Sequence, residues 1–517
     1  MTAAPLPLQQ LQTPEQAGQW LRARVRGALH SDSRRVTPGD GFVAWPGASA
    51  DGRQHVRAAL QRGAAACLVE QAGAEDFDLP ADGVASYAGL KAASGPIAAA
   101  FYGQASPPLD VVAITGTNGK TSSACWLAES LVQWQLQKNE QDRQATVGLA
   151  GTFGLKMPEM TGFDSVQQPR WQATGLTTPD PITWQGYLRL LADAGSRYCV
   201  VEASSIGLAE QRLAGTRIRV AVLTNFTQDH LDYHGSMQAY WQAKAALFAW
   251  PGLQAAVINI DDAQGAALAD ALGHQALDLW TVSCQRPARL QAQGIHYDDQ
   301  AQCFTLREGP QSAVMRTALL GEYNVSNLLG VVAALRALGV PFADCIAACA
   351  ALAPVPGRMQ RLGAPGQPLV VVDYAHTPDA LDKLLGALRP LARQRGGRLW
   401  CVFGCGGDRD RAKRPLMAAI AEKNADQVVV TSDNPRSERP EAIICQILLG
   451  LSHRESVHVQ ADRAQAIAQT LAEAHSADVV VLAGKGHEET QEIGGISSPF
   501  SDWAHAEAAL QARRDAP

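Results

Sequence analysis

At 517 residues, the chain is too long for one hydrophobic core, and its length predicts about three domains. Its composition, 46% hydrophobic and 18% charged, is that of an ordinary globular protein. The formal net charge of −6 argues against a nucleic-acid or anionic-membrane partner, so local basic pockets must bind any anionic ligand.

The ends and the cysteines favour a cytoplasmic protein. Residues 1–16 lack a basic segment followed by an apolar one, so we expect no secretory signal. No run approaches about 18 apolar residues, so we expect no membrane span. The ten cysteines include no C-x-x-C pair, and no histidine cluster accompanies Cys345/Cys349 or Cys401/Cys405. Reduced, mostly buried thiols are the expected state.

The clearest motif lies in residues 109–126, LDVVAITGTNGKTSSACW. A short apolar run (111–114) leads into a glycine turn and then into a helix start, as in a phosphate-binding loop. Ile114 stands where a strict P-loop has glycine, so the match is to the shorter form TGTNGKT (115–121). The alternative is a tight turn with an incidental lysine, and nucleoside triphosphate binding is our working hypothesis.

The residue types in this loop suit a triphosphate and its metal. Gly116 and Gly119 allow a tight turn that presents backbone N–H groups to phosphate. Lys120 adds a positive charge, and the Thr121 hydroxyl can bind magnesium.

Residues 109–353 alternate strand and helix patterns, which predicts a mostly parallel sheet. One predicted strand (198–201) ends at Glu202, and another ends beside His230. Ligands of open α/β sheets bind beyond the carboxyl ends of the strands, so we expect one site shared with the phosphate loop. The polar, Gln-rich stretch 133–172 predicts a surface excursion without an assigned role.

The first part of the chain, residues 1–107, predicts a small α/β domain. Residues 32–34 (Asp-Ser-Arg) precede a strand-like segment (41–45), and a polar loop (47–52) follows it. Alone, these are a turn and a loop. A Pro-rich joint (106–108) separates the domain from the phosphate loop.

The predicted helix 237–250 contains a lysine where an apolar residue is expected. Lys244 lies in the centre of its apolar stripe, whose members are Tyr240, Trp241, Leu247 and Phe248. Such a lysine either extends to solvent, the commoner outcome, or is buried with a partner. Burial would lower the pKa of the amine and make it nucleophilic, including toward carbon dioxide.

The last part of the chain, from about residue 354, predicts a third α/β unit. Four predicted strands end in charged or glycine-rich turns, at residues 373–376, 404–409, 432–436 and 483–488. One such turn is ordinary loop composition, but four together indicate a site. We expect this domain to close over the nucleotide held by the second.

Taken in chain order, these motifs resemble the Mur ligase family, ATP-dependent amide-forming enzymes that build the peptidoglycan stem peptide. The resemblance covers essentially the whole chain. Its marks, besides the Lys244 helix, are TGTNGKT (115–121), VEASS (201–205), TNFTQDHLDYHG (224–235), GEYNVSN (321–327), PGRMQ (356–360), DYAHTPDAL (373–381), GCGGDRD (404–410), DNPR (433–436) and GKGHE (484–488).

The resemblance implies an α/β fold in three domains. These are an N-terminal UDP-substrate-binding domain (1–107), a central P-loop parallel-sheet ATPase domain (108–353) and a C-terminal Rossmann-like amino-acid-binding domain (354–517). It implies ATP and Mg²⁺ as cofactors and small-molecule substrates as partners. We expect a cytoplasmic monomer that binds no nucleic acid and does not span a membrane.

Within the family, the motifs look like those of the enzyme that adds the third stem residue to UDP-N-acetylmuramoyl-L-alanyl-D-glutamate. DNPR looks like the version that selects meso-diaminopimelate over lysine. Diaminopimelate carries an extra carboxylate, which Arg436 and Arg409 can bind through two N–H groups each, while Asp433 or Glu488 can receive an ammonium. A charge-assisted hydrogen bond is worth about 1.5–3 kcal/mol, roughly one to two decades of discrimination.

The resemblance also assigns roles residue by residue. The implied ATP-binding residues are Gly116, Thr117, Asn118, Gly119, Lys120, Thr121, Ser122, Asn324, Arg358, Asp373 and His376. The implied UDP-substrate residues are Ser33, Ala48, Ser49, Ala50, Thr177, Thr178, Ser204, Glu210 and Arg212. The implied diaminopimelate residues are Arg409, Asp433, Asn434, Pro435, Arg436, Gly484 and Glu488. Asn324 as a helix cap and Arg358 as a surface charge remain open alternatives.

The implied catalytic residues are Lys120, Glu202, His230 and Lys244. Lys244 is expected to be carbamylated, which converts a cation into an anion, and to bind magnesium together with Thr121, Glu202 and His230. The acceptor carboxylate would attack the ATP γ-phosphate to form an acyl phosphate. The amine of diaminopimelate would then displace phosphate, with catalysis mainly by positioning and electrostatics.

Some residues depart from the family pattern. Ile206 occupies the place of a common histidine, Glu210 that of a glutamine, Leu176 that of an Asn found in some members, and Thr490 that of a tyrosine. These departures bear on acceptor details. Three alternatives stay open: a lysine-adding sibling ligase, a folylpolyglutamate-synthase-like ligase, and an inactive nucleotide-binding or regulatory module.

Overall fold

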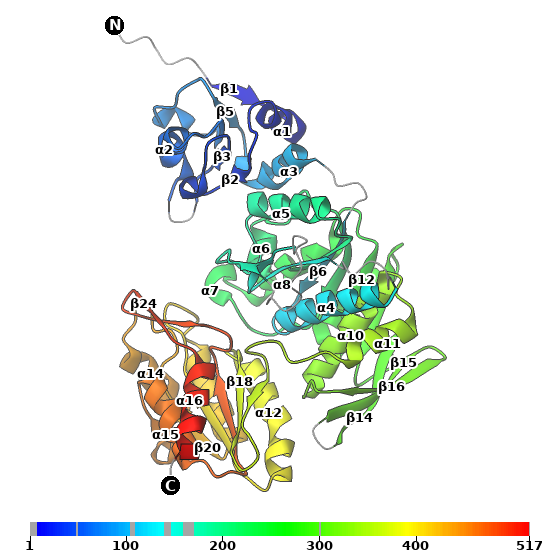
Figure 1. Ribbon diagram of the computed structural model, residues 1–517, viewed down its shortest axis with the longest axis vertical. Helices are drawn as coiled ribbons and strands as arrows, with labels where there is room; N and C mark the ends of the chain where they lie inside the picture. The colour runs from blue at the N-terminus through cyan, green and yellow to red at the C-terminus, as the bar shows by residue number, and fades with distance from the viewer. Residues whose placement is uncertain are drawn as a thin grey trace.

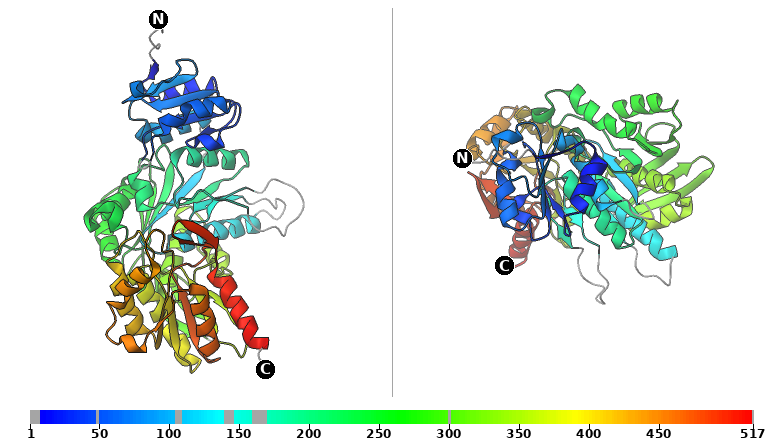
Figure 2. Two further views of the ribbon diagram at one scale, coloured as in Figure 1. Left: turned by 90° about the vertical axis from the view of Figure 1, so that its left-hand side faces the viewer. Right: turned by 90° about the horizontal axis from the view of Figure 1, so that it is seen from above.

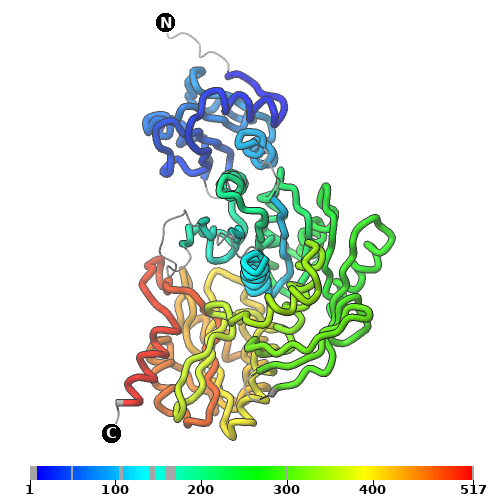
Figure 3. Tube along the Cα trace, turned by 45° about the vertical axis from the view of Figure 1, so that its right-hand side comes forward, coloured from blue at the N-terminus to red at the C-terminus, as the bar shows by residue number. Residues whose placement is uncertain are grey.

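The computed structural model describes residues 8–47, 50–103, 109–138, 146–158, 170–298 and 301–515. Three α/β domains follow one another along the long axis of the molecule, with the chain ends at opposite ends (Figure 1). The same order is seen from the side and along the Cα trace (Figures 2 and 3). Each domain has its own sheet, as the sequence predicts.

The N-terminal domain is built on a parallel five-stranded sheet in the order β1-β5-β4-β3-β2. Its strands are β1 (Gln9–Leu11), β2 (Leu29–His30), β3 (Gly41–Ala44), β4 (Ala66–Glu70) and β5 (Val84–Tyr87). Its helices are α1 (Pro14–Arg22), η1 (Ser33–Arg35), η2 (Gly52–His55), α2 (Val56–Gln61), η3 (Ala74–Asp76) and α3 (Leu90–Tyr102). Ile182 of the next domain is buried in this core, which joins the two domains.

The central domain has an eleven-stranded sheet in the order β16-β15-β14-β13-β12-β11-β6-β10-β7-β8-β9. Its strands are β6 (Asp110–Thr115), β7 (Val147–Gly151), β8 (Gly154–Lys156), β9 (Trp171–Gln172), β10 (Tyr198–Glu202), β11 (Ile218–Leu223), β12 (Ala255–Asn259), β13 (Asp278–Ser283), β14 (Leu290–Asp298), β15 (Ala301–Glu308) and β16 (Gln311–Thr317). Its helices are α4 (Lys120–Lys138), α5 (Pro181–Asp193), α6 (Ser205–Ala209), α7 (Leu231–His234), α8 (Met237–Ala245), η4 (Ala246–Ala249), α9 (Ala263–Leu272), α10 (Glu322–Ala337) and α11 (Phe342–Ala350).

Strand β6 lies in the middle of the central sheet because it is apolar on both faces. Val112 and Ile114 pack into the core that contains α4 and α10, whereas Val111 and Ala113 pack into the core that contains α5 and α9. Its neighbours β10 and β11 run parallel to it. This double burial is typical of a parallel sheet covered by helices. The carboxyl ends of all three strands therefore meet at one edge.

The prediction that residues 133–172 form a surface excursion is wrong for part of that stretch. Helix α4 continues to Lys138, and β7 is a fully buried strand beside β10. The side chains of Leu191 and Glu202 pack directly against the two glycines of β7 and leave no space for a side chain there. A Cβ on Gly148 would lie 2.2 Å from a Leu191 methyl, and one on Gly151 would lie 2.1 Å from Glu202 Oε1.

The C-terminal domain has a six-stranded sheet in the order β17-β18-β22-β19-β20-β21, with an antiparallel β23-β24 hairpin beside it. Its strands are β17 (Gln360–Leu362), β18 (Leu369–Asp373), β19 (Leu399–Phe403), β20 (Gln427–Val430), β21 (His458–Val459), β22 (Val479–Ala483), β23 (Thr490–Ile493) and β24 (Ile496–Pro499). Its helices are α12 (Pro378–Gln394), α13 (Lys413–Asn424), α14 (Pro440–Leu448), η5 (Arg454–Ser456), α15 (Arg463–Glu473) and α16 (Asp502–Asp515).

Two further properties bear on the sequence predictions. All ten cysteines are free thiols, and most are buried. In the part of the chain that the structure describes, no helix is long and apolar enough to cross a bilayer.

Candidate active site

The phosphate loop connects β6 to α4 through two glycines with positive φ, Gly116 at 145° and Gly119 at 84°. A Cβ on Gly116 would lie 1.9 Å from Thr224 Oγ1, and one on Gly119 would lie 2.4 Å from Asn327 Oδ1. Both positions therefore require glycine for conformation and for space. Lys120 Nζ folds back over the loop and donates to the carbonyls of Gly116 and Thr117, each at 2.8 Å.

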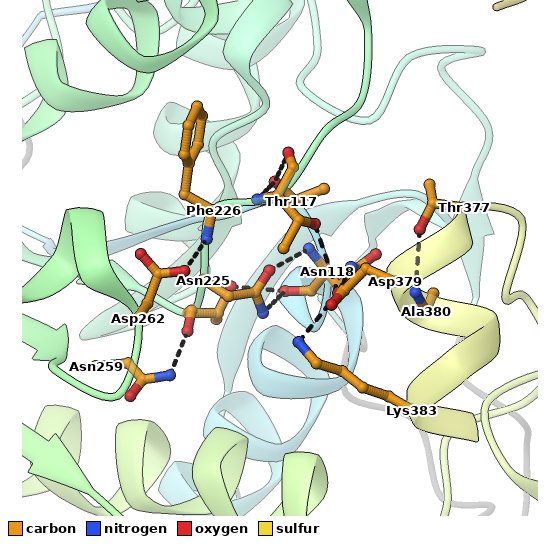
Figure 4. A network of polar contacts seen from close by, with 12 residues as sticks. Thr117, Asn118, Asn225, Phe226, Asn259, Asp262, Thr377, Asp379, Ala380 and Lys383 are labelled. Atoms are coloured by element: carbon orange, nitrogen blue, oxygen red, sulfur yellow. Dashed lines mark hydrogen bonds and ion pairs between the residues drawn. The ribbon is translucent and has the colours of Figure 1, made fainter. Parts of the chain in front are cut away.

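Side chains from the segment after β11 and from the C-terminal domain hold the loop in this shape (Figure 4). The Asn118 backbone N–H donates to Asn225 Oδ1 at 2.9 Å. The Asn118 side-chain amide donates to Asp379 Oδ2 at 3.0 Å, and Lys383 Nζ donates to the same oxygen at 3.0 Å. Asp379 lies in the first turn of α12, so the loop is joined directly to the C-terminal domain.

Glu202, at the end of β10, is buried behind the first turn of α4. Its Oε2 accepts hydrogen bonds from Thr121 Oγ1 at 2.9 Å and Thr152 Oγ1 at 3.2 Å, and its Oε1 accepts from the Thr152 backbone at 2.8 Å. Arg358 Nη2 donates to Thr121 Oγ1 at 3.3 Å from the other domain. Arg358 is therefore a cleft residue, and its reading as a surface charge is wrong.

Lys244 does not reach solvent: the residue is 1% exposed. Its Nζ donates to the Gly116 carbonyl at 2.8 Å and lies 4.6 Å from the centre of the Tyr240 ring. Burial lowers the pKa of Lys244 well below its ordinary value, and the charge of Lys120 lowers it further, against an opposing effect of Asp229. This shift favours the neutral, nucleophilic form of the amine. The helix around it is shorter than predicted, because α8 ends at Ala245 and a 3-10 turn follows.

His230 is in the left-handed conformation, with φ 51°, at the start of α7. Its Nε2 lies 3.5 Å from Asp229 Oδ2. Burial lowers the pKa of His230, although Asp229 acts in the opposite direction. The ring is therefore biased toward the neutral form, which can bind a metal.

The proposed metal residues Thr121, Glu202, His230 and Lys244 all line one cavity of about 220 Å³. The described residues contain no cluster of three or more His, Cys, Asp or Glu side chains suited to a metal. Magnesium usually takes one or two protein carboxylates and completes its shell with water and phosphate oxygens. The hydroxyl and carboxylate oxygens of Thr121 and Glu202 fit that requirement.

The opposite wall of this cavity comes from the C-terminal domain. The Arg358 guanidinium lies 4.3 Å from the centre of the Tyr374 ring. The Asp373 carboxylate accepts from the backbone of Met359 at 2.7 Å, and burial raises its pKa. Burial lowers the pKa of His376 to about 4. Of the residues expected to bind ATP, those that line the cavity are Thr117, Asn118, Gly119, Lys120, Thr121, Ser122, Asn324, Arg358, Asp373 and His376.

The residues expected to bind the amino acid lie together in loops after β19, β20 and β22. Arg436 and Arg409 flank Gly406: a Cβ there would lie 3.0 Å from Arg436 Nη1 and 3.8 Å from Arg409 Cγ. Burial raises the pKa of Asp433. A Cβ on Gly484 would lie 2.5 Å from Asp433 Oδ2. Two carboxylates, those of Asp433 and Glu488, and two arginine side chains thus lie in one group of loops.

The residues expected to bind the UDP-linked substrate divide into two sets. Thr177 and Ser204 line the central cavity, and the buried Thr178 Oγ1 donates to the Glu202 carbonyl at 2.6 Å. Arg212 Nη1 donates to the Thr178 carbonyl at 3.1 Å. Ser33 and Ala50 lie in the N-terminal domain and do not line this cavity. Ala48 and Ser49 lie outside the described residues.

Glu210 contacts protein groups on two sides. Lys91 Nζ, from α3 of the N-terminal domain, lies 2.5 Å from Glu210 Oε2. The Tyr233 hydroxyl donates to Glu210 Oε1 at 2.7 Å. No local sequence pattern predicts the role of Lys91, because the contact joins residues far apart in the chain. Asp379 lies within the motif DYAHTPDAL, which is the one sequence signal for its place at the site.

The sequence matches three family descriptions. These are "Mur ligase family, catalytic domain" over residues 28–100, "Mur ligase middle domain" over 114–335 and "Mur ligase, glutamate ligase domain" over 357–486.

Two relatives are named UDP-N-acetylmuramoyl-L-alanyl-D-glutamate--2,6-diaminopimelate ligase. The one from Acidovorax sp. (strain JS42) is 58% identical over 506 residues, 98% of this chain and 99% of its own. The one from Janthinobacterium sp. (strain Marseille) is 45% identical over 505 residues, 96% of each chain.

Solved structures show the same fold. One titled as a UDP-N-acetylmuramoyl-L-alanyl-D-glutamate--2,6-diaminopimelate ligase has a TM-score of 0.61 at 34% identity, covering 94% of this chain and 95% of its own. MurF ligase from Thermotoga maritima in complex with ADP has a TM-score of 0.64 at 17% identity, covering 96% and 99%. Mycobacterium tuberculosis folylpolyglutamate synthase complexed with ADP has a TM-score of 0.55 at 20% identity, covering 73% and 88%.

Proposed function

This chain belongs to the Mur ligase family, and we propose that it is the ligase that joins meso-diaminopimelate to UDP-N-acetylmuramoyl-L-alanyl-D-glutamate. The reaction consumes ATP and forms ADP and phosphate. The observation that carries this proposal is the 58% identity, over 98% of the chain, to a relative with that name. The folylpolyglutamate synthase alternative has less support, because that structure covers only 73% of the chain.

The first step transfers the γ-phosphoryl group of ATP to a carboxylate of the acceptor. A carboxylate oxygen forms a bond to phosphorus, the bond from phosphorus to the β–γ bridging oxygen breaks, and ADP leaves. The loop N–H groups, Lys120 and Arg358 offset the negative charge that gathers on the phosphate oxygens. Lys120 must turn from the loop carbonyls to the phosphates, a change that its flexible side chain allows.

Magnesium, when bound, would neutralise phosphate charge and orient the oxygens for transfer. Thr121 and Glu202 would hold one ion, and His230 and a carbamylated Lys244 would contribute to a second. The neutral Lys244 amine can add to carbon dioxide, forming an N–C bond and releasing one proton. The burial and lowered pKa of Lys244 support this modification.

The second step forms the amide. The amine of diaminopimelate attacks the acyl carbon, phosphate leaves with the C–O bond electrons, and the nitrogen loses a proton. Arg436 and Arg409 would bind the distal carboxylate, with Asn434, Pro435 and Gly484 shaping the pocket. Asp433 and Glu488 would receive the distal ammonium. Because the two steps share one cleft, positioning supplies much of the rate.

The acceptor would extend from the cleft toward the N-terminal domain. Its peptide and sugar would contact Thr177, Thr178, Ser204, Glu210 and Arg212, and its uridine end would contact Ser33 and the loop 48–50. We propose domain boundaries after residues 107 and 353. We also propose that the reaction takes place in the cytoplasm and that the protein acts as a monomer.

Mass spectrometry of the product tests this function. The purified protein, incubated with ATP, magnesium, the UDP-linked dipeptide and meso-diaminopimelate, should form a nucleotide product heavier by one diaminopimelyl residue, with one ADP per product. Absence of that product, with ATP bound, would contradict the proposal.

A further inference from the structure

A buried lysine lies beneath the residues expected to bind the amino acid, and the proposed mechanism does not use it. Lys485, which follows β22, is 0% exposed. Its Nζ donates to Asn434 Oδ1 at 3.1 Å, to Glu488 Oε2 at 3.1 Å and to the Thr490 carbonyl at 2.7 Å. All three N–H groups of the ammonium therefore have an acceptor, which is what a fully buried cation requires.

These bonds decide the orientation of the Asn434 side chain. Asn434 Oδ1 accepts from Lys485 Nζ and from the Glu492 backbone N–H at 3.1 Å. Its amide nitrogen must then face away from Lys485, and it donates to Glu488 Oε2 at 2.7 Å. A flipped amide would point N–H groups at the ammonium and at a backbone N–H.

The same hydrogen bonds orient the Glu488 carboxylate for ligand binding. Its Oε2 already accepts from Lys485 and Asn434, whereas no donor from the described residues reaches its Oε1. The side chain keeps 29% of its surface exposed. One oxygen is thus held by the protein, and the other is available to an ammonium group of a ligand.

Lys485 also fixes the start of the β23-β24 hairpin, through the Thr490 carbonyl. This hairpin pairs with the backbone of Arg436: Arg436 N–H donates to the Glu492 carbonyl at 3.0 Å, and Gly494 N–H donates to the Arg436 carbonyl at 2.7 Å. Arg436 has φ 54°, a conformation that is costly for a residue with a side chain and needs such support. Its Nη1 donates to the Gly407 carbonyl at 2.7 Å.

We propose that Lys485 is a positioning residue for the amino-acid substrate, acting through Asn434, Glu488 and the β23-β24 hairpin that holds Arg436. This inference rests on the proposed function, because it assumes that these residues receive the distal amino-acid group of diaminopimelate. Lysine, as a substrate, lacks the distal carboxylate and makes fewer contacts there. Loss of Lys485 therefore reduces the use of diaminopimelate more than the use of lysine.

The test is Lys485→Met, which keeps the length of the side chain and removes its charge and donors. In steady-state assays of the full-length protein with the UDP-linked dipeptide, the KM for meso-diaminopimelate should rise at least tenfold. The ratio of kcat/KM for diaminopimelate to that for L-lysine should fall at least fivefold. The KM for ATP should change less than twofold. Leu385→Ala, a core truncation in α12, is the control for lost stability and should leave the ratio unchanged.

A comparison of Glu488→Gln with Lys485→Met/Glu488→Gln keeps the inference testable if Lys485→Met does not fold. In the double variant, residue 488 no longer carries a charge that needs the Lys485 ammonium. If Lys485 acts through Glu488, adding Lys485→Met to Glu488→Gln should raise the KM less than threefold. A further tenfold rise in the KM for diaminopimelate between Glu488→Gln and the double variant, or an unchanged diaminopimelate-to-lysine ratio in Lys485→Met, would overturn the inference. An inactive wild-type protein would instead contradict the proposed function, so the two failures are distinguishable.

Discussion

Asn118 in the phosphate loop donates a hydrogen bond of 3.0 Å to Asp379 in the C-terminal domain (Figure 4). This contact joins the loop that is expected to hold the nucleotide to the domain that is expected to bring the attacking amine. Lys383 holds the same carboxylate oxygen from the next turn of α12. The relative position of the two domains thus bears directly on the shape of the phosphate loop.

We expect Asp379→Ala to raise the KM for ATP about fivefold, because a net hydrogen bond of this kind is worth about 1 kcal/mol. Steady-state kinetics with varied ATP measures the effect. Asp382→Ala is the matched control, since the exposed Asp382 lies on the same helix and, among the described residues, accepts a hydrogen bond from Asn424. Equal KM values in the two variants would contradict a role for the contact.

Lys244→Ala should abolish ligation, because it removes the amine that is proposed to become an anionic magnesium ligand. Short carboxylates such as formate or acetate should restore part of the activity by supplying oxygen ligands at the vacated position. Gln242→Ala, an exposed position on the same helix, should remain active. Full activity of Lys244→Ala without added carboxylate would exclude the proposed role.

Arg436→Asn should lower kcat/KM for meso-diaminopimelate about 10- to 100-fold, because one charge-assisted pair is worth about 1.5–3 kcal/mol. The KM for ATP should stay within twofold of the wild type. Arg439→Asn, with 85% of its side chain exposed, is the control and should behave as the wild type. Equal losses for ATP and diaminopimelate would show that Arg436 supports the fold and not the selection.

The ion pair between Lys91 and Glu210 predicts a compensating pair of substitutions. Lys91 and Tyr233 lower the pKa of Glu210 and keep it charged beside the wall expected to face an anionic acceptor. Lys91→Met should raise the acceptor KM about two- to fivefold, as expected for a half-exposed pair worth about 0.2–1 kcal/mol. Lys91→Met/Glu210→Gln should return near the wild-type value. A double variant as weak as the single one would rule out charge compensation.

The stability of the C-terminal domain should depend on pH through Glu438. Both oxygens of Glu438 accept from the fully buried Arg414, at 2.8 and 3.0 Å, which lowers the pKa of Glu438 from 4.5 to about 2. Because the folded-state pKa is depressed, this stabilisation is complete above about pH 4.5 and is lost as the pH falls toward 2.

Glu438→Gln should destabilise the protein by about 3–5 kcal/mol near neutral pH, because it leaves Arg414 buried without its carboxylate. Urea unfolding of both proteins at several pH values measures this, and the difference should shrink between pH 5 and 3. Glu441→Gln, at an exposed neighbouring acid, should have little effect. A difference that does not vary with pH would show that the charge of Glu438 contributes nothing.

Much of the fold follows from local patterns in the sequence. The apolar run before Gly116 predicts β6, and the four turns after residue 372 predict the loops around Arg436, because buried parallel strands need continuous apolar segments. An apolar run does not predict β7, because Gly148 and Gly151 interrupt the strand pattern of that segment. They are glycines because Leu191 and Glu202 fill the room beside them, and no local pattern contains that information.

Some residues of the candidate site can be predicted from the sequence, whereas others depend on tertiary packing. Their positions at strand and helix ends predict that Lys120, Thr121 and Glu202 belong to the site. The apolar stripe of the helix does not decide whether Lys244 is buried or exposed, because burial depends on tertiary packing. The β23-β24 hairpin was missed, although Gly494-Gly495 between two β-prone segments is a signal for a two-residue turn. The contacts of Lys485 and Lys91 join distant segments, so only the three-dimensional structure reveals them.

The most direct test of the proposed function is phosphate release from ATP in the presence of the UDP-linked dipeptide, with meso-diaminopimelate or L-lysine as the amine. We expect strong release with diaminopimelate and at least tenfold less with lysine at equal concentration. Equal or greater release with lysine would contradict the assigned role of Arg436 while leaving the ligase chemistry intact. No release with either amine would contradict the proposed acceptor.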